Sequence, residues 1–98
     1  MNNKSTDPAL FVTEGDIDGS NAHRLLTGLM PLIEQHRHVV IDMRNTTSIT
    51  SKGLAALLDA VKLAGDRRLE IRHASNDVAE LLELTGFARL IDLGRQQR

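Results

Sequence analysis

The spacing of apolar residues along the chain predicts strands that alternate with helices. Residues 10–12 form a short apolar run typical of a strand, and residues 16–18 are interpreted as a second short strand or as the exit from the first. After a cap at Ser20 or Asn21, apolar residues recur at every third or fourth position, which predicts an amphipathic helix. Pro31 lies inside this pattern and is expected to kink the helix or end it early, because proline lacks an N–H group.

The middle of the chain holds the clearest strand. Residues 39–43 form a β-branched run that is apolar on both faces, which is typical of a central parallel strand covered on two sides. A polar loop follows, and a second helix is predicted from a cap at Thr50 or Ser51 as far as Gly65. Residues 69–72 alternate between apolar and polar side chains, which predicts a weaker strand with one face nearer solvent or at an edge of the sheet.

The last third of the chain predicts one more helix and a final strand. Residues 75–77 offer three candidate caps, and Gly86 is placed to end the helix in a left-handed conformation. Residues 90–93 are then expected to form a short last strand. Because strands separated by helices require crossover connections, the sheet is predicted to be mostly parallel and the fold class to be α/β.

Composition restricts the chain to one small domain and excludes several classes of function. With 98 residues, we expect a flexible leader over 1–8, a single domain over 9–93 and a polar tail over 94–98. A formal net charge of −1 and only two aromatic residues argue against nucleic-acid binding. There is no cysteine for disulfides or thiolate chemistry, no apolar run long enough to span a membrane and no signal peptide, so a cytoplasmic protein is expected.

Candidate catalytic and metal-binding residues all have a simpler interpretation. The sequence contains no common nucleophile, zinc-protease or P-loop motif. His36 and His38 lack a third metal ligand and are expected to be solvated, while Asp16 and Asp18 are expected to accept hydrogen bonds from the backbone. Asp42 ends the central strand where α/β sheets place their sites, so a small-ligand site is one interpretation there and hydrogen bonding to the next loop is the simpler one.

The loop between the central strand and the second helix is the most unusual segment. Five of the six residues from Thr46 to Ser51 carry hydroxyl groups. The start of a helix has free N–H groups and a partial positive charge, so it tolerates an added phosphate, and Gly53 permits close approach by another backbone or by a partner. The alternative is that Thr50 or Ser51 simply caps the helix.

Three segments, in this order, resemble the STAS domain of bacterial anti-sigma factor antagonists. Residues 14–18 resemble the early Gly-x-Ile/Leu-Asp signature of that family. Residues 39–43 and 48–58 resemble its central strand and helix, and residues 75–87 resemble its Ser-x-x-Val…Leu…Gly-Leu/Phe helix. The resemblance covers residues 9–93 and implies a small STAS-type α/β sandwich with a mostly parallel central sheet and crossover helices, without a cofactor, a metal or catalytic activity.

The resemblance also implies a function in partner switching. Antagonists of this family bind an anti-sigma factor that is also a serine kinase and thereby release a sigma factor, until one hydroxyl at the start of the central helix is phosphorylated. The usual loop reads Asp-Ser-Ser/Thr-Gly, whereas this chain has Lys52 at the acceptor position, which leaves Ser51 or Thr50 as the candidate acceptor. The partner-binding residues implied by the resemblance are Asp18, Thr50, Ser51, Lys52, Gly53 and Leu54.

The missing acceptor leaves a second function open. A STAS subunit of another complex, such as one that docks on the ATPase of a lipid-exporting ABC transporter or on a signalling scaffold, does not need a phosphorylated hydroxyl. Both interpretations imply a protein partner and make no use of nucleic acid or membrane insertion, and neither defines an oligomeric state.

Overall fold

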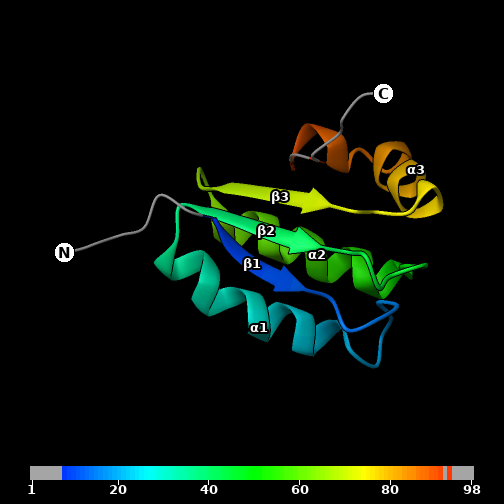
Figure 1. Ribbon diagram of the computed structural model, residues 1–98, viewed down its shortest axis with the longest axis horizontal. Helices are drawn as coiled ribbons and strands as arrows, with labels where there is room; N and C mark the ends of the chain where they lie inside the picture. Colours follow the sequence, from blue (N-terminus) through cyan, green and yellow to red (C-terminus); the bar gives the residue numbers. More distant parts are fainter. Residues whose placement is uncertain (1–7, 92, 94–98) are drawn as a thin grey trace.

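The computed structural model describes residues 8–91 and residue 93, and within them it contains one three-stranded sheet and three α-helices (Figure 1). The elements, in chain order, are β1 (Ala9–Val12), α1 (Ala22–Gln35), β2 (His38–Asp42), α2 (Ser51–Ala64), β3 (Arg68–Arg72), α3 (Asn76–Leu84) and a short 3-10 helix η1 (Phe87–Arg89). The predicted α/β class is confirmed.

The three described strands are parallel and follow one another in the order β1-β2-β3. The central position predicted for residues 39–43 is confirmed by β2, and the edge position predicted for residues 69–72 is confirmed by β3. Because side chains alternate between the faces of a strand, Val39 and Ile41 lie on one face of β2, and Val40 and Asp42 lie on the other.

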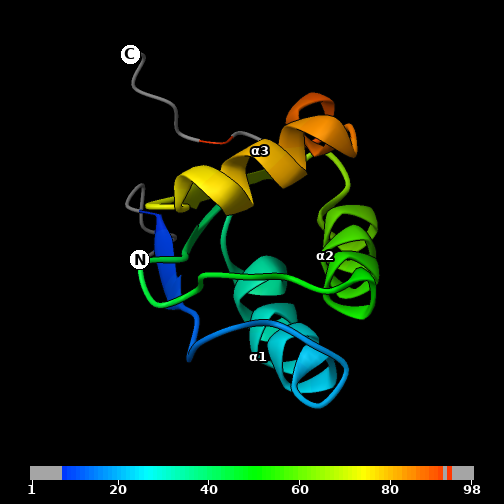
Figure 2. The same cartoon turned by 90° about the vertical axis from the view of Figure 1, so that its right-hand side faces the viewer.

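Helices α1 and α2 cover one face of the sheet, while α3 and η1 lie on the side of β3 (Figures 1 and 2). The core is a single cluster of buried side chains that includes Leu29 of α1, Leu57 of α2, Ile41 and Ile71 of the sheet, and Leu82 of α3. Burying an aliphatic side chain of this size contributes about 1.5–3 kcal/mol. The cluster therefore holds both helices firmly against the sheet.

Helix α1 does not end at Pro31, so of the two expected outcomes, a kink or an early stop, the early stop is excluded. The helix continues to Gln35 with Pro31 inside it. The proline side chain is exposed, whereas Leu29 and Ile33 on either side of it are buried against the sheet. Burial of these two side chains outweighs the one helical hydrogen bond that the missing N–H removes.

One predicted strand is wrong, and one of two alternatives is excluded. Residues 16–18 are not a second strand but the exit from β1, where Ile17 forms an isolated bridge with Ile49. Leu90, Ile91 and Leu93 are not in a strand, because the amides of Leu90 and Ile91 donate to the Phe87 carbonyl instead, each over 2.9 Å. Asp92, residues 1–7 of the predicted leader and residues 94–98 of the predicted tail lie outside the described residues.

Candidate functional site

The loops that follow β1 and β2 are hydrogen-bonded to each other beyond the end of the sheet. The Ile17 amide donates to the Ser48 carbonyl over 3.1 Å, and the Thr50 amide donates to the Ile17 carbonyl over 2.9 Å. These bonds form the parallel bridge between Ile17 and Ile49. The first residues of α2 are thereby attached to the loop that precedes α1.

Two aspartates hold these loops in shape. The Asp16 carboxylate accepts from the amide and hydroxyl of Thr47, over 2.7 and 2.8 Å, and from the amide of Ser48 over 3.1 Å. The Thr47 amide is the largest cause of the lowered pKa of Asp16. Asp18 accepts from the hydroxyl and amide of Ser20, and these bonds lower its pKa. The predicted role of both aspartates as acceptors of backbone donors is confirmed.

One residue of the hydroxyl-rich loop is buried. Thr46 is 2% exposed, and its hydroxyl donates to the Gly15 carbonyl over 2.6 Å. The hydroxyls of Thr46 and Thr13 lie 2.6 Å apart, and the Thr13 hydroxyl oxygen lies 3.3 Å from the Asp42 carbonyl oxygen. Thr46 therefore joins the two loops from inside and is inaccessible to a partner.

The start of α2 combines a cap with a close backbone approach. The Thr50 hydroxyl accepts from the Gly53 amide over 3.3 Å, so the predicted cap is confirmed. A Cβ atom on Gly53 would lie 2.7 Å from Ile17 Cγ2 and 2.9 Å from the Ile17 carbonyl oxygen. Gly53 was expected to permit close approach either by another backbone or by a partner. The backbone that approaches it is that of Ile17 in the same chain. Ser51 and Lys52 remain exposed in the first turn, and Leu54 is half-buried.

Lys52 extends over the loop that contains Asp18. A Cβ atom on Gly19 would lie 2.9 Å from Lys52 Cδ, so the aliphatic part of the lysine covers this glycine. The structure therefore brings together, at one end of the molecule, all six residues predicted for partner binding: Asp18, Thr50, Ser51, Lys52, Gly53 and Leu54.

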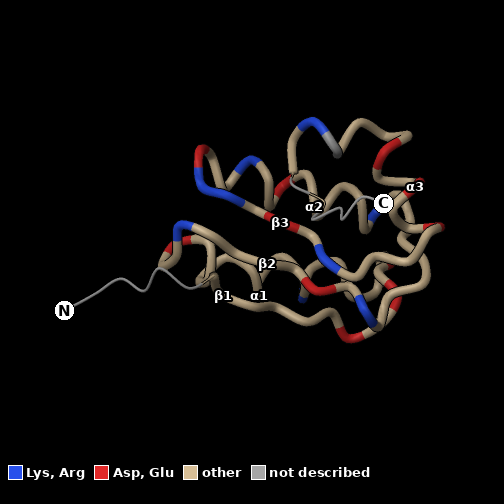
Figure 3. The backbone as a smooth tube through the Cα atoms, turned by 45° about the horizontal axis from the view of Figure 1, so that its top comes forward, with Lys and Arg blue, Asp and Glu red and all other residues tan. Residues whose placement is uncertain are grey.

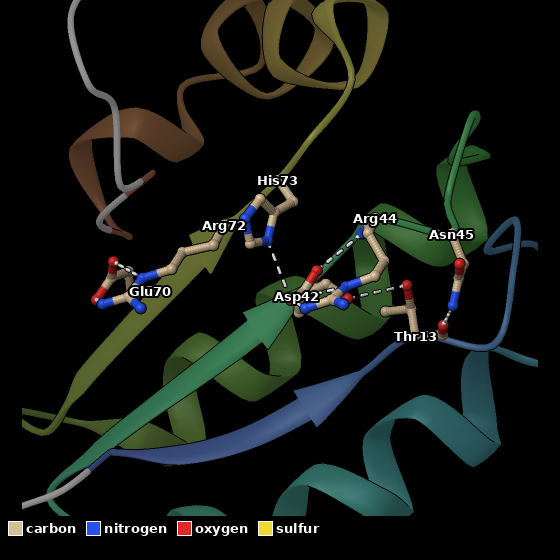
Figure 4. A network of polar contacts seen from close by, with 7 residues as sticks. All are labelled: Thr13, Asp42, Arg44, Asn45, Glu70, Arg72 and His73. Atoms are coloured by element: carbon tan, nitrogen blue, oxygen red, sulfur yellow. Dashed lines mark hydrogen bonds and ion pairs between the residues drawn. The ribbon is translucent and has the colours of Figure 1, made fainter.

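A second polar network lies at the ends of β2 and β3 (Figure 4). Asp42 is 2% exposed, and its carboxylate accepts from the Arg44 amide over 3.0 Å, from Arg44 Nε over 3.1 Å, and from the Arg44 Nη2 group. It also contacts His73 Nδ1 at 3.0 Å. The Arg44 side chain is the main reason why the pKa of Asp42 lies well below its ordinary value. The simpler interpretation of Asp42, hydrogen bonding to the next loop, is confirmed.

Comparison with known proteins gives the family. A family model described as "Mlab, STAS domain" matches residues 4–92, which is most of the chain. The chain belongs to this STAS family. No curated protein matches it.

The STAS fold is also found among solved structures. The chain is similar to a crystal structure from Thermotoga maritima of a protein provisionally assigned as an anti-sigma factor antagonist. The TM-score is 0.75 at 15% sequence identity, over 85% of this chain and 74% of that chain. At this identity the likeness shows the fold, and it confirms the STAS-type α/β architecture that the sequence resemblance implies.

The STAS domain shows no metal site among its described residues. No group of three His, Cys, Asp or Glu side chains is gathered there to hold an ion. Nor is any helix in the part described long and apolar enough to cross a membrane.

The prediction that His38 is solvated is wrong. Its side chain is 21% exposed, and its Nε2 lies 2.8 Å from Glu70 Oε1.

Three participants in the polar networks of this STAS domain have roles that were not predicted from the sequence. They are Glu70, Arg44 and His73, although Arg44 follows Asp42 at the two-residue spacing that lets a carboxylate bond to the backbone. His73 has a φ of 61°, a left-handed conformation with no local sequence signal. Its partner, Asp42, lies 31 residues earlier in the chain.

Proposed function

We propose that this STAS domain is a protein-binding module that captures an anti-sigma factor or a related serine kinase, as anti-sigma factor antagonists do. Its docking surface consists of Asp18, Thr50, Ser51, Lys52 and Leu54, with Gly53 buried beneath them. The observation that carries the proposal is the exposed start of α2, which is bonded to the Asp18 loop and covered by no described element. In this proposal the domain itself performs no catalysis.

The charge of Lys52 defines the chemistry of this docking surface. A cation at a helix N-terminus is mildly unfavourable for the helix, so its position there is not explained by helix stability. Lys52 is exposed, and the aliphatic part of its side chain lies over Gly19. We propose that the partner places a carboxylate against the Lys52 ammonium group.

Reversing the charge of Lys52 tests the docking surface. We expect Lys52→Glu to weaken binding to the anti-sigma factor kinase of the same organism by about tenfold or more, because a carboxylate would then face a carboxylate. Isothermal titration calorimetry measures the affinity. The melting temperature should not fall, since glutamate is favourable in the first turn of a helix.

Lys62→Glu is the matched control, since it makes the same charge change in the last turn of α2, also on an exposed side chain. It should bind like the unchanged protein. Equal affinities for Lys52→Glu and the unchanged protein would place docking elsewhere on the domain.

Phosphorylation, where it occurs, is expected at Ser51. Lys52 cannot accept phosphate, Thr46 is buried, and the Thr50 hydroxyl is used to cap Gly53. Ser51 is exposed at the first position of α2. Incubation with the same kinase and ATP, followed by mass spectrometry, should find phosphate on Ser51 and none in Ser51→Ala. Absence of phosphate from all of residues 46–51 would rule out a switch in this loop.

The second candidate function is that of a STAS subunit in another complex, such as one built on the ATPase of a lipid-exporting ABC transporter. Lys52 favours it, because a constitutive subunit has no need of a hydroxyl at the acceptor position. Affinity purification from the native host separates the two proposals. Recovery of a sigma-regulating kinase supports the first, and recovery of a transporter ATPase without such a kinase supports the second.

A further inference from the structure

A pocket opens between β1 and the first turns of α1. These two elements lie side by side (Figure 1), and Phe11 packs against Gly28, where an added Cβ would lie 2.6 Å from Phe11 Cε2. The pocket lies about one helical turn nearer the start of α1. We call it the β1–α1 pocket, and its lining includes Phe11, Ile17, Leu25, Asn21, Glu14 and Arg24.

The buried part of the β1–α1 pocket is lined by apolar side chains. Ile17 and Leu25 are buried members of the core, and Phe11 is half-buried. About 300 Å³ of space lies within the pocket, part of it open to solvent, which is at the lower end of the range for small-molecule sites. Gly15 also lines the pocket, and a Cβ atom there would meet no atom within 4 Å. The pocket thus has room for a short aliphatic group.

Hydrogen bonds within the chain hold the polar part of the lining in place. Asn21 Nδ2 donates to the Asp16 carbonyl over 2.7 Å, and Asn21 Oδ1 accepts from the Asp18 amide over 2.9 Å. The Gly15 carbonyl accepts from the buried Thr46 hydroxyl over 2.6 Å. The pocket therefore has a fixed shape before a ligand arrives, which reduces the entropy lost on binding.

Two opposite charges lie together on the solvent side of the β1–α1 pocket. Arg24 Nη2 is 3.1 Å from Glu14 Oε1, and the two side chains are 64% and 75% exposed. Glu14 belongs to the segment directly after β1, where Figure 3 shows acidic residues next to an uncharged strand. An ion pair this exposed contributes little to stability and opens at little cost. A ligand that carries both charges can therefore enter between the two side chains and satisfy each of them.

We propose that the β1–α1 pocket binds a free aliphatic α-amino acid. Its carboxylate accepts from the Arg24 guanidinium, its ammonium group donates to the Glu14 carboxylate, and its side chain packs on Ile17 and Leu25. A free amino acid carries both charges on one carbon and is neutral overall. A fatty acid, an alkylamine or one end of a peptide brings only one of these charges and leaves the other residue of the pair without its partner. This inference goes beyond the proposed function and uses none of its residues.

Titration of the full chain with L-leucine, followed by amide NMR, tests the pocket. We expect a Kd on the order of 1 mM, with shifts concentrated in residues 11–25. Isocaproate lacks the ammonium group, isoamylamine lacks the carboxylate and glycine lacks the aliphatic side chain, so each should bind at least about threefold more weakly. The proposal is overturned if L-leucine causes no shift in these residues at about 10 mM, or if isocaproate or isoamylamine binds as tightly as L-leucine.

Matched variants assign each charge of the ligand to its residue. Glu14→Gln should weaken L-leucine by about threefold and bring its affinity down to that of isocaproate, because the ammonium group then has no carboxylate to bind. Arg24→Gln should do the same relative to isoamylamine. The controls Glu34→Gln and Arg37→Gln make the same changes on exposed residues outside the pocket and should bind like the unchanged protein.

A further variant separates the pocket from the start of α2. Lys52→Glu should bind L-leucine like the unchanged protein, whatever its effect on a protein partner. Loss of L-leucine binding in Lys52→Glu, with unchanged binding in Glu14→Gln and Arg24→Gln, would overturn the pocket proposal and leave the proposed docking surface intact.

Discussion

Replacing Gly53 by alanine is expected to lower the free energy of unfolding by about 3 kcal/mol. The added Cβ would lie 2.7 Å from Ile17 Cγ2, 2.9 Å from Ile49 Cγ2 and 2.9 Å from the Ile17 carbonyl oxygen. The two methyl groups can rotate away, but the carbonyl is fixed by its hydrogen bond from the Thr50 amide. The start of α2 must therefore move away from the loop.

The sign of this effect is informative because glycine is a poor helix former. In an open helix, glycine to alanine stabilises by about 1 kcal/mol. Urea unfolding of Gly53→Ala measures the balance, and Gly15→Ala is the matched control, because no atom lies within 4 Å of its added Cβ. If Gly53→Ala were as stable as the unchanged protein, the loop that contains Ile17 would be able to move away from the added Cβ at little cost in free energy.

Replacing Asp42 by asparagine is expected to cost about 2 kcal/mol at neutral pH, because a buried carboxylate loses charge-assisted bonds to Arg44 and His73. The pKa of Asp42 is lowered in the folded protein, mainly by Arg44. Its ionised form therefore stabilises the fold above the ordinary carboxyl pKa of about 4, and this stabilisation is lost as pH falls towards the lower folded-state pKa.

Urea unfolding at a series of pH values from 7 to about 3 tests this linkage. The unchanged protein should lose more stability on acidification than Asp42→Asn does, so the two curves should converge at low pH. Asp59→Asn, on an exposed residue of α2, should instead follow the unchanged protein. Parallel curves for Asp42→Asn and the unchanged protein would show that Asp42 is not the group that titrates.

Local patterns predicted the central strand and the start of the helix that carries the proposed docking surface. The β-branched run of residues 39–43 identified β2, because burial on both faces requires apolar residues at consecutive positions. Thr50 was a predicted cap because its short hydroxyl side chain reaches the amide three residues later, as it does to Gly53. Both signals lie within one segment of the chain, so they are readable without the tertiary structure.

Features that depend on distant residues were not predictable in this way. Pro31 is tolerated because Leu29 and Ile33 are buried by the sheet. His38 is bound to Glu70, 32 residues later. The periodicity of a sequence reports which side of an element is apolar, and it does not identify the polar partner that another element supplies.

For the proposed docking surface, the three hydrogen bonds accepted by Asp16 are expected to affect how fast and how tightly a partner binds. They lock two loops from different parts of the chain into one unit before any partner arrives. Association then requires no folding of the loops, and little conformational entropy is lost there when the complex forms. Asp16 is thus expected to raise the affinity of the proposed docking surface without contacting the partner.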